Sequence, residues 1–170
     1  MKTLTNTTVI SNFAAVNRLD LLRSLLGRLY ISTEVYEEIL NGLEEGYIFY
    51  EGIDELIFPF ADDGWIELVS LAGEEELRRF GQIPKRLHRG KASCLAIARE
   101  RKWAFLTDDK LARRMARKWN IEVSGTLGIL VRAMEMSLLA VEEANVLLRQ
   151  MTEHANYHSP IADLRVLLTD

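Results

Sequence analysis

Hydrophobic and polar residues alternate along the chain in short blocks that predict strands followed by helices. Residues 89–118 show this most clearly, because an amphipathic helix beginning at Gly90 leads into the apolar run Trp103-Ala104-Phe105-Leu106. A short, continuously apolar run is typical of a strand that is covered on both faces. Asp108 and Asp109 follow it, and a second amphipathic helix comes after them. The two carboxylates are therefore expected at the carboxyl end of a buried strand, the edge where ligands bind in open α/β sheets.

The same alternation continues over the rest of the chain. It predicts further strands at residues 3–10, 29–31, 65–69 and 121–123. It predicts helices at residues 19–26, 33–42, 73–80, 125–136 and 141–155, an irregular helix within residues 46–62 that Pro59 ends, and a last short helix after Pro160. Ser11 or Asn12 is expected to cap a short helix after the first strand. The fold class is therefore α/β, one domain over residues 1–170, with a central, mostly parallel sheet of about five short strands and helices on both faces.

Composition agrees with a soluble globular protein. Of the 170 residues, 48% are apolar and 27% are charged, which argues against disorder. No apolar run is long enough to cross a bilayer, and the N-terminus lacks the apolar segment of a signal peptide, so no membrane association is expected. With Cys94 as the one cysteine, no internal disulfide can form, and a cytoplasmic location is the expectation.

Charge is distributed unevenly along the chain. The formal net charge is −4, yet residues 34–76 hold fourteen acidic residues and no Lys or Arg, and residues 78–118 hold fourteen Lys or Arg and three acidic residues. A basic block of this kind fits a polyanion such as RNA as a partner. Solvated helix faces explain the same charges equally well.

Asp108-Asp109 is the strongest local candidate for chemistry. Carboxylates at a strand end are ligands for Mg²⁺ or Mn²⁺, and such a cation can generate a hydroxide nucleophile beside a scissile phosphate. A lone Asp-Asp pair is, however, better explained if Asp109 caps the helix that follows.

Several segments together carry a family resemblance, namely LTNTTVISNF, GWIELV, RGKASCLAIA and LTDD followed by a basic helix and SGTLG. In this order they resemble PIN-domain proteins, and are most similar to the VapC-like toxin ribonucleases of type II toxin–antitoxin modules. The resemblance covers nearly the whole chain. It implies a three-layer α/β/α fold, Mg²⁺- or Mn²⁺-dependent cleavage of RNA, a cognate antitoxin protein as a partner and a homodimer.

The resemblance also implies a set of site residues. The acidic pair is kept as Asp108 and Asp109, but the family's acidic positions in the first strand and in the helix after the glycine are Asn6 and Lys91 in this chain. The implied catalytic positions are thus Asn6, Lys91, Asp108 and Asp109, and the implied metal ligands are Asn6, Asp108 and Asp109. Because an ammonium group repels a divalent cation, Lys91 is expected to pair with Asp108 or Asp109 in the place of the metal.

Further residues are expected beside this site. An acidic side chain from elsewhere, Glu37, Glu38 or Asp63, could complete it. The candidate nucleic-acid contacts are Ser11, Asn12, Arg113, Arg114, Arg117 and Thr126. Helix capping, a tight turn and solvated helix faces are the structural alternatives for these residues. Two functions follow: a metal-dependent endoribonuclease toxin, or a catalytically inactive PIN-like module that needs no cofactor and binds nucleic acid or protein.

Overall fold

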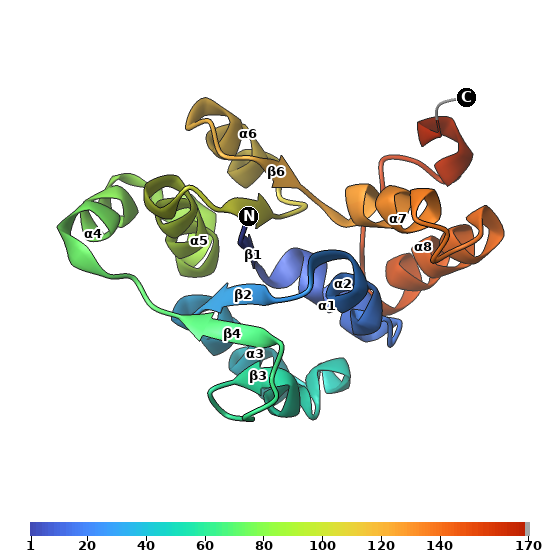
Figure 1. Ribbon diagram of the computed structural model, residues 1–170, viewed down its shortest axis with the longest axis horizontal. Coiled ribbons are helices and arrows are strands. Elements are labelled where there is room, and N and C mark those ends of the chain that lie inside the picture. Colours follow the sequence, from blue (N-terminus) through green and yellow to red (C-terminus); the bar gives the residue numbers. More distant parts are fainter. Residues whose placement is uncertain (169–170) are drawn as a thin grey trace.

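A computed structural model describes residues 1–168, and its centre is a parallel sheet of six strands in the order β3-β4-β2-β1-β5-β6 (Figure 1). Every pair of neighbouring strands is parallel. The strands are β1 (Thr3–Thr5), β2 (Leu29–Ser32), β3 (Ile57–Phe58), β4 (Ile66–Val69), β5 (Ala104–Leu106) and β6 (Val123–Ser124). This confirms the predicted α/β fold, with one strand more than the five that were predicted.

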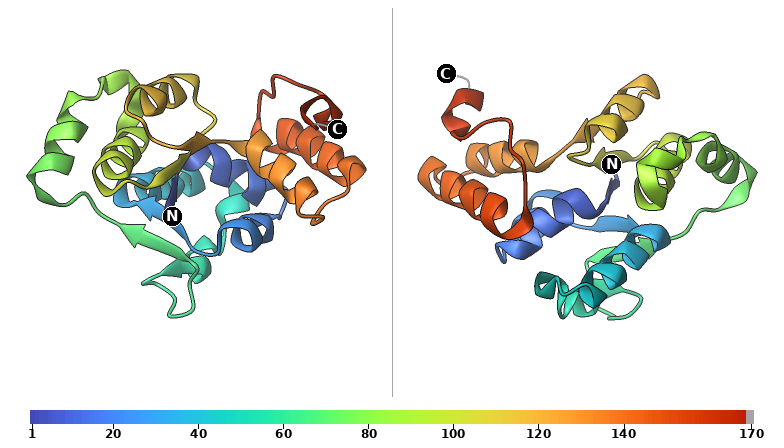
Figure 2. Two further views of the ribbon diagram at one scale, coloured as in Figure 1. Left: turned by 45° about the horizontal axis from the view of Figure 1, so that its top comes forward. Right: turned by 180° about the vertical axis from the view of Figure 1, so that it is seen from behind.

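Helices cover both faces of the sheet, which gives three layers. The helices are α1 (Thr7–Ala15), α2 (Leu19–Leu26), α3 (Thr33–Glu44), α4 (Gly73–Gln82), α5 (His88–Arg101), α6 (Lys110–Lys118), α7 (Thr126–Glu135) and α8 (Val141–Ala155), with 3₁₀ turns η1 (Ile48–Tyr50), η2 (Ile53–Leu56), η3 (Lys85–Leu87) and η4 (Leu164–Leu167). Helix α5 packs against α4 and α6, whereas α1 and α2 pack against α8 and α7 (Figures 1 and 2). Helix α3 contacts both α1 and α5.

The core forms where these layers meet. Leu4, Ile31 and Phe105, from three adjacent strands, have no exposed surface. The apolar run that predicted a doubly covered strand is therefore β5, although it begins at Ala104 rather than at Trp103. Cys94 is fully buried in α5.

The first strand is shorter than predicted. Asn6 leaves the strand with an extended backbone and caps α1, so the β-branched residues 7–10 are helical. Burial of Val9, Ile10 and Phe13 against the core outweighs their strand propensity. Ser11 and Asn12 consequently lie inside α1, and the prediction that one of them caps it was wrong.

The region predicted as an irregular helix, residues 46–62, contains η1, η2 and β3 instead. Gly52 has a left-handed backbone (φ 77°), which interrupts helical structure between the two 3₁₀ turns. Strand β3 then pairs with β4 through Ile57 and Ile66. Strand β3, with two residues, is too short to show the alternation of apolar and polar residues that would distinguish a strand from a turn.

Other boundaries agree with the pattern. Gly27, with φ 69°, ends α2 as predicted, and α8 has the predicted limits. After Pro160 the structure has the turn η4, and residues 169–170 of the predicted last helix lie outside the described residues.

The acidic and basic stretches of the sequence also lie in different parts of the folded molecule. The acidic stretch contributes α3, β3 and β4, and the basic stretch contributes α5, β5 and α6, toward opposite ends of the strand order (Figure 1). Within residues 1–168, no helix has the length and apolar character needed to span a membrane.

Candidate functional site

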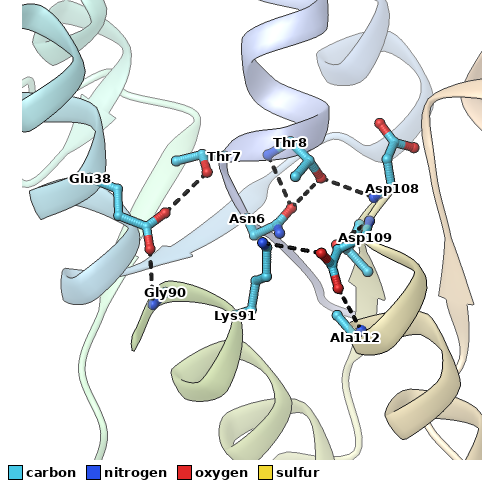
Figure 3. Close-up of polar contacts among 10 residues, drawn as sticks. Asn6, Thr7, Thr8, Glu38, Gly90, Lys91, Asp108, Asp109 and Ala112 are labelled. Atoms are coloured by element: carbon cyan, nitrogen blue, oxygen red, sulfur yellow. Dashed lines mark hydrogen bonds and ion pairs between the residues drawn. The ribbon is translucent and has the colours of Figure 1, made fainter. Parts of the chain in front are cut away.

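Most of the predicted site residues meet at the carboxyl ends of three neighbouring strands, β1, β5 and β6. Asn6 follows β1, Asp108 and Asp109 follow β5, and Thr126 follows β6. Lys91 comes from the first turn of α5. In Figure 3 the Lys91 side chain extends toward Asp109 and Asn6, while the Asp108 carboxylate points away from them.

Asn6 is fully buried and serves the start of α1. Its Oδ1 accepts hydrogen bonds from the backbone N–H of Thr8 (3.2 Å) and from the Thr8 hydroxyl (2.7 Å). The Thr8 hydroxyl oxygen in turn accepts the N–H of Asp108 (2.9 Å), which links the start of α1 to the segment after β5. Within the described residues, Asn6 Nδ2 has no hydrogen-bond partner. The Asn6 oxygen that a cation would need is therefore already engaged by Thr8. The Nδ2 group that remains is a hydrogen-bond donor and cannot ligate a cation.

Lys91 and Asp109 form an ion pair, with 3.3 Å between Nζ and Oδ2. The other carboxylate oxygen of Asp109 accepts the N–H of Ala112 (2.8 Å) and caps α6. Both structural expectations for Asp109, the helix cap and the pair with Lys91, are thus present together. The pair is only partly exposed, at 17% for Lys91 and 29% for Asp109.

Asp108 is held on the other side by Thr126 and Asn12. It accepts hydrogen bonds from the Thr126 N–H (2.7 Å), the Thr126 hydroxyl (2.6 Å) and Asn12 Nδ2 (3.1 Å). Burial raises the pKa of Asp108 above its ordinary value, although these bonds and the nearby Arg113 charge oppose the shift. Gly125 permits this arrangement, because a Cβ there would collide with the Asp108 carboxylate. The Thr126 N–H that was predicted to bind phosphate is occupied by Asp108.

Glu38 is the acidic residue that the fold adds to this edge. Its carboxylate accepts the N–H of Gly90 (3.1 Å) and the hydroxyl of Thr7 (3.0 Å), beside Asn6 and Lys91 (Figure 3). A Cβ at Gly90 would meet this carboxylate, so a larger residue there would displace Glu38 from its present position. Of the other two acids considered, Glu37 and Asp63 are exposed, whereas Glu38 is tied to this edge by its two hydrogen bonds. Nothing in the sequence alone indicates that Glu38, and not Glu37, is the residue that reaches this edge of the sheet.

Two adjacent cavities, of about 360 and 510 Å³, lie along this edge and share Asp108, Lys110, Tyr157 and His158. The larger one is also lined by Ser11 and Asn12, and the smaller one by Arg113. Arg114 and Arg117 line neither cavity and are exposed on α6. Lys110, Tyr157 and His158 were not predicted as site residues. Tyr157 and His158 lie in the segment after α8, which carries no motif and is distant in sequence, whereas Lys110 directly follows Asp109 and its position next to the acidic pair could have indicated it.

The donor set does not fit a divalent metal ion. Such a cation needs several oxygen ligands. Asn6 directs its oxygen to Thr8, Lys91 places an ammonium group beside Asp109, and Asp108 is turned toward Thr126. In residues 1–168, no group of three or more His, Cys, Asp or Glu side chains is placed to hold a metal.

Comparison with known proteins places the chain in a family. A family model described as a PIN domain matches residues 2–167. A search of curated proteins gives no match. The family match spans far more than half of the chain, and it agrees with the three-layer fold and its parallel sheet. The chain therefore belongs to the PIN-domain family.

Proposed function

We propose that this PIN-domain protein binds RNA at the carboxyl edge of its sheet and does not cleave it with a metal ion. The observation that supports this most directly is the ion pair between Lys91 and Asp109, at 3.3 Å. The pair gives Asp109 a positive partner without any bound cation. The protein would then keep the fold of a nuclease and use it for binding.

Electrostatics support the loss of metal chemistry. At 4 Å and an intermediate dielectric, the Lys91 ammonium would be repelled by about 4 kcal/mol for each positive charge on a cation. Asn6 has no charge to offset this repulsion, and its oxygen is engaged by Thr8. A divalent ion would therefore have to displace Lys91 before it could use Asp109.

The basic surface beside the cleft supports RNA as the ligand. Lys110 is exposed and lines both cavities, and Arg113 lines the smaller one. Arg114 and Arg117 continue the positive surface along α6, and among residues 1–168 neither forms an ion pair. Cations arranged in this way attract the phosphate backbone of RNA without regard to its sequence.

The second candidate is a Mg²⁺- or Mn²⁺-dependent endoribonuclease toxin whose cleft is covered by an antitoxin. The position of Glu38 favours it, because this carboxylate lies at the same edge as Asp108 and Asp109. In this candidate Lys91 moves aside, and Asn6, Asp108 and Asp109 hold the ion. A homodimer is compatible with either function.

Calorimetric titration with Mn²⁺ distinguishes the two candidates. We expect the wild-type protein to show no binding, and the double variant Asn6→Asp/Lys91→Glu to bind Mn²⁺, because it replaces an amide and a cation with two carboxylates beside Glu38 and Asp109. Lys91→Met is the matched control, since it removes the positive charge without adding a ligand. Micromolar binding by the wild type, together with Mn²⁺-dependent cleavage of RNA, would favour the toxin candidate and overturn the proposal.

A further inference from the structure

The segment that follows α8, residues 156–161, contributes to the lining of the cleft. Tyr157 and His158 line both cavities, together with Asp108, which follows β5, and Lys110, which begins α6. A ligand that occupies both cavities would therefore contact these four shared residues.

The backbone of this segment is fixed at both ends. Asn156 has a left-handed backbone (φ 56°) and ends α8, and the N–H of Tyr157 donates to the carbonyl of Met151 (3.3 Å). The same Met151 carbonyl also accepts the N–H of Asn156. At the other end, the N–H of the buried Leu164 donates to Asn145 Oδ1 (2.9 Å). Tyr157 is therefore positioned by α8 before any ligand binds.

The hydrogen bonds of Ser159 hold the turn after His158. Its hydroxyl donates to the carbonyl of Ile161 (2.6 Å), and its oxygen accepts the N–H of Ile161 (3.2 Å). This closed turn, together with the two anchored ends, holds the backbone on both sides of Tyr157, and Tyr157 lines both cavities. A preorganised aromatic residue loses little conformational freedom on binding.

The chemistry at Tyr157 fits a nucleobase. Burial, reinforced by the charge of Asp108, raises the pKa of Tyr157 to about 12, against the opposing effects of Ser159 and Arg113. The phenol is thus neutral at physiological pH and adds no negative charge beside RNA. Lys110 and Arg113 supply cations close to the ring. An aromatic face next to cations is the arrangement that binds single-stranded nucleic acid.

We propose that Tyr157 is a stacking platform for one base of a single-stranded RNA, with adjacent nucleotides in the two cavities and Lys110 near the phosphates. The inference rests on the proposed RNA-binding function and assigns it a strand type and a site. Each cavity, at about 360 and 510 Å³, has the size of a small-molecule site. Duplex RNA should bind more weakly, because its bases are paired and stacked and cannot reach the Tyr157 ring.

The test measures fluorescence anisotropy of a labelled single-stranded RNA ten nucleotides long, in EDTA and at several salt concentrations. Tyr157→Leu should raise Kd about 5- to 150-fold, the range expected for the loss of one stacked base, while the slope of log Kd against log salt stays unchanged. Tyr157→Phe should bind like the wild type. Tyr47→Leu, at an exposed tyrosine outside the cleft, is the control for the loss of a tyrosine elsewhere on the surface.

The outcomes separate this inference from the proposed function. Wild-type binding that Tyr157→Leu leaves intact would overturn the stacking role alone, and RNA binding would stand. A wild type that binds no RNA would overturn both. Tyr157→Leu keeps an apolar side chain in the half-buried position, and thermal unfolding of each variant verifies that an altered Kd does not come from lost folding. Equal affinity for a duplex of the same sequence would also contradict the inference.

Discussion

Asp109 directs its two carboxylate oxygens to two different partners. One oxygen accepts the N–H of Ala112 at the start of α6, and the other faces the Lys91 ammonium. The cap is local in sequence, whereas the ion pair connects α5 to α6. Because both groups of the pair are partly exposed to solvent, we expect the cap to contribute more to stability than the pair.

Two substitutions at this residue measure the two contributions. Asp109→Ala removes the cap and the pair, and should lower the free energy of unfolding by about 1–2 kcal/mol. Asp109→Asn keeps a capping oxygen and loses only the charge, so it should cost about 0–1 kcal/mol. Urea unfolding monitored by circular dichroism gives both values. Equal losses in the two variants would show that the ion pair with Lys91, and not the cap, carries the stabilisation.

At the scale of elements, Glu76 joins α4 to α5. Its carboxylate accepts two hydrogen bonds from Arg101 (2.6 and 3.0 Å) and one from the N–H of Ala72 (2.7 Å). Burial acts to raise the pKa of Glu76, but the bonds from Arg101 and Ala72 and the Arg101 charge outweigh it and hold the pKa below 4.5. A carboxyl whose pKa is lowered by folding stabilises the folded state above its unfolded pKa. That stabilisation is lost as the pH falls through the folded pKa.

Glu76→Gln should therefore lower the free energy of unfolding by about 1–3 kcal/mol at pH 7. The difference from the wild type should shrink as the pH falls well below 4.5, because the wild-type carboxyl becomes protonated there. Urea unfolding of both proteins at pH 7 and at a pH well below 4.5 measures this difference in the free energy of unfolding. Glu75→Gln is the matched control, since Glu75 pairs with Arg78 at the exposed surface of the same helix and should contribute little. If Glu76→Gln remained less stable than the wild type by the same amount at low pH, the negative charge of Glu76 would not be the source of the stabilisation.

The sequence predicted the elements whose pattern is long enough to show a period. Helix α8 has fifteen residues and the predicted limits, and β5 is a continuous apolar run. Strand β3, with two residues, has no period of its own and exists because it pairs with β4. Residues 7–10 favour a strand locally, but packing of α1 against the core decides for a helix.

The candidate site was predictable only in part, for a related reason. Asn6, Lys91, Asp108 and Asp109 stand next to strand ends or to the glycine that precedes a helix, so their order along the chain indicated one edge of the sheet. Glu38 reaches that edge from the second turn of α3, and Tyr157 from the end of α8. Their positions depend on how helices pack, which short-range patterns do not encode.

At the scale of the whole molecule, strand order separates the charges. Strands β3 and β4 belong to the acidic stretch and lie at one end of the sheet, whereas β5, beside β6, belongs to the basic stretch at the other end. Residues of the basic α6 line the cleft, and no residue of α3 is among the lining residues of either cavity. A polyanion that approaches the protein is therefore attracted toward one end of the cleft, although the net charge of −4 is repulsive.

This separation predicts which arginines RNA binding should depend on. Each phosphate contact that is lost should reduce the slope of log Kd against log salt by about 0.7 for a single strand. We therefore expect Arg114→Ala and Arg117→Ala each to lower the slope by up to this amount and the double variant to lower it by their sum, with little change in stability because both side chains are exposed. Arg23→Ala, at an exposed arginine of α2, should leave the slope unchanged. Anisotropy titrations of the same RNA at several salt concentrations measure all four slopes. If Arg23→Ala had the same effect as the α6 variants, binding would follow the total charge of the protein and not the position of α6.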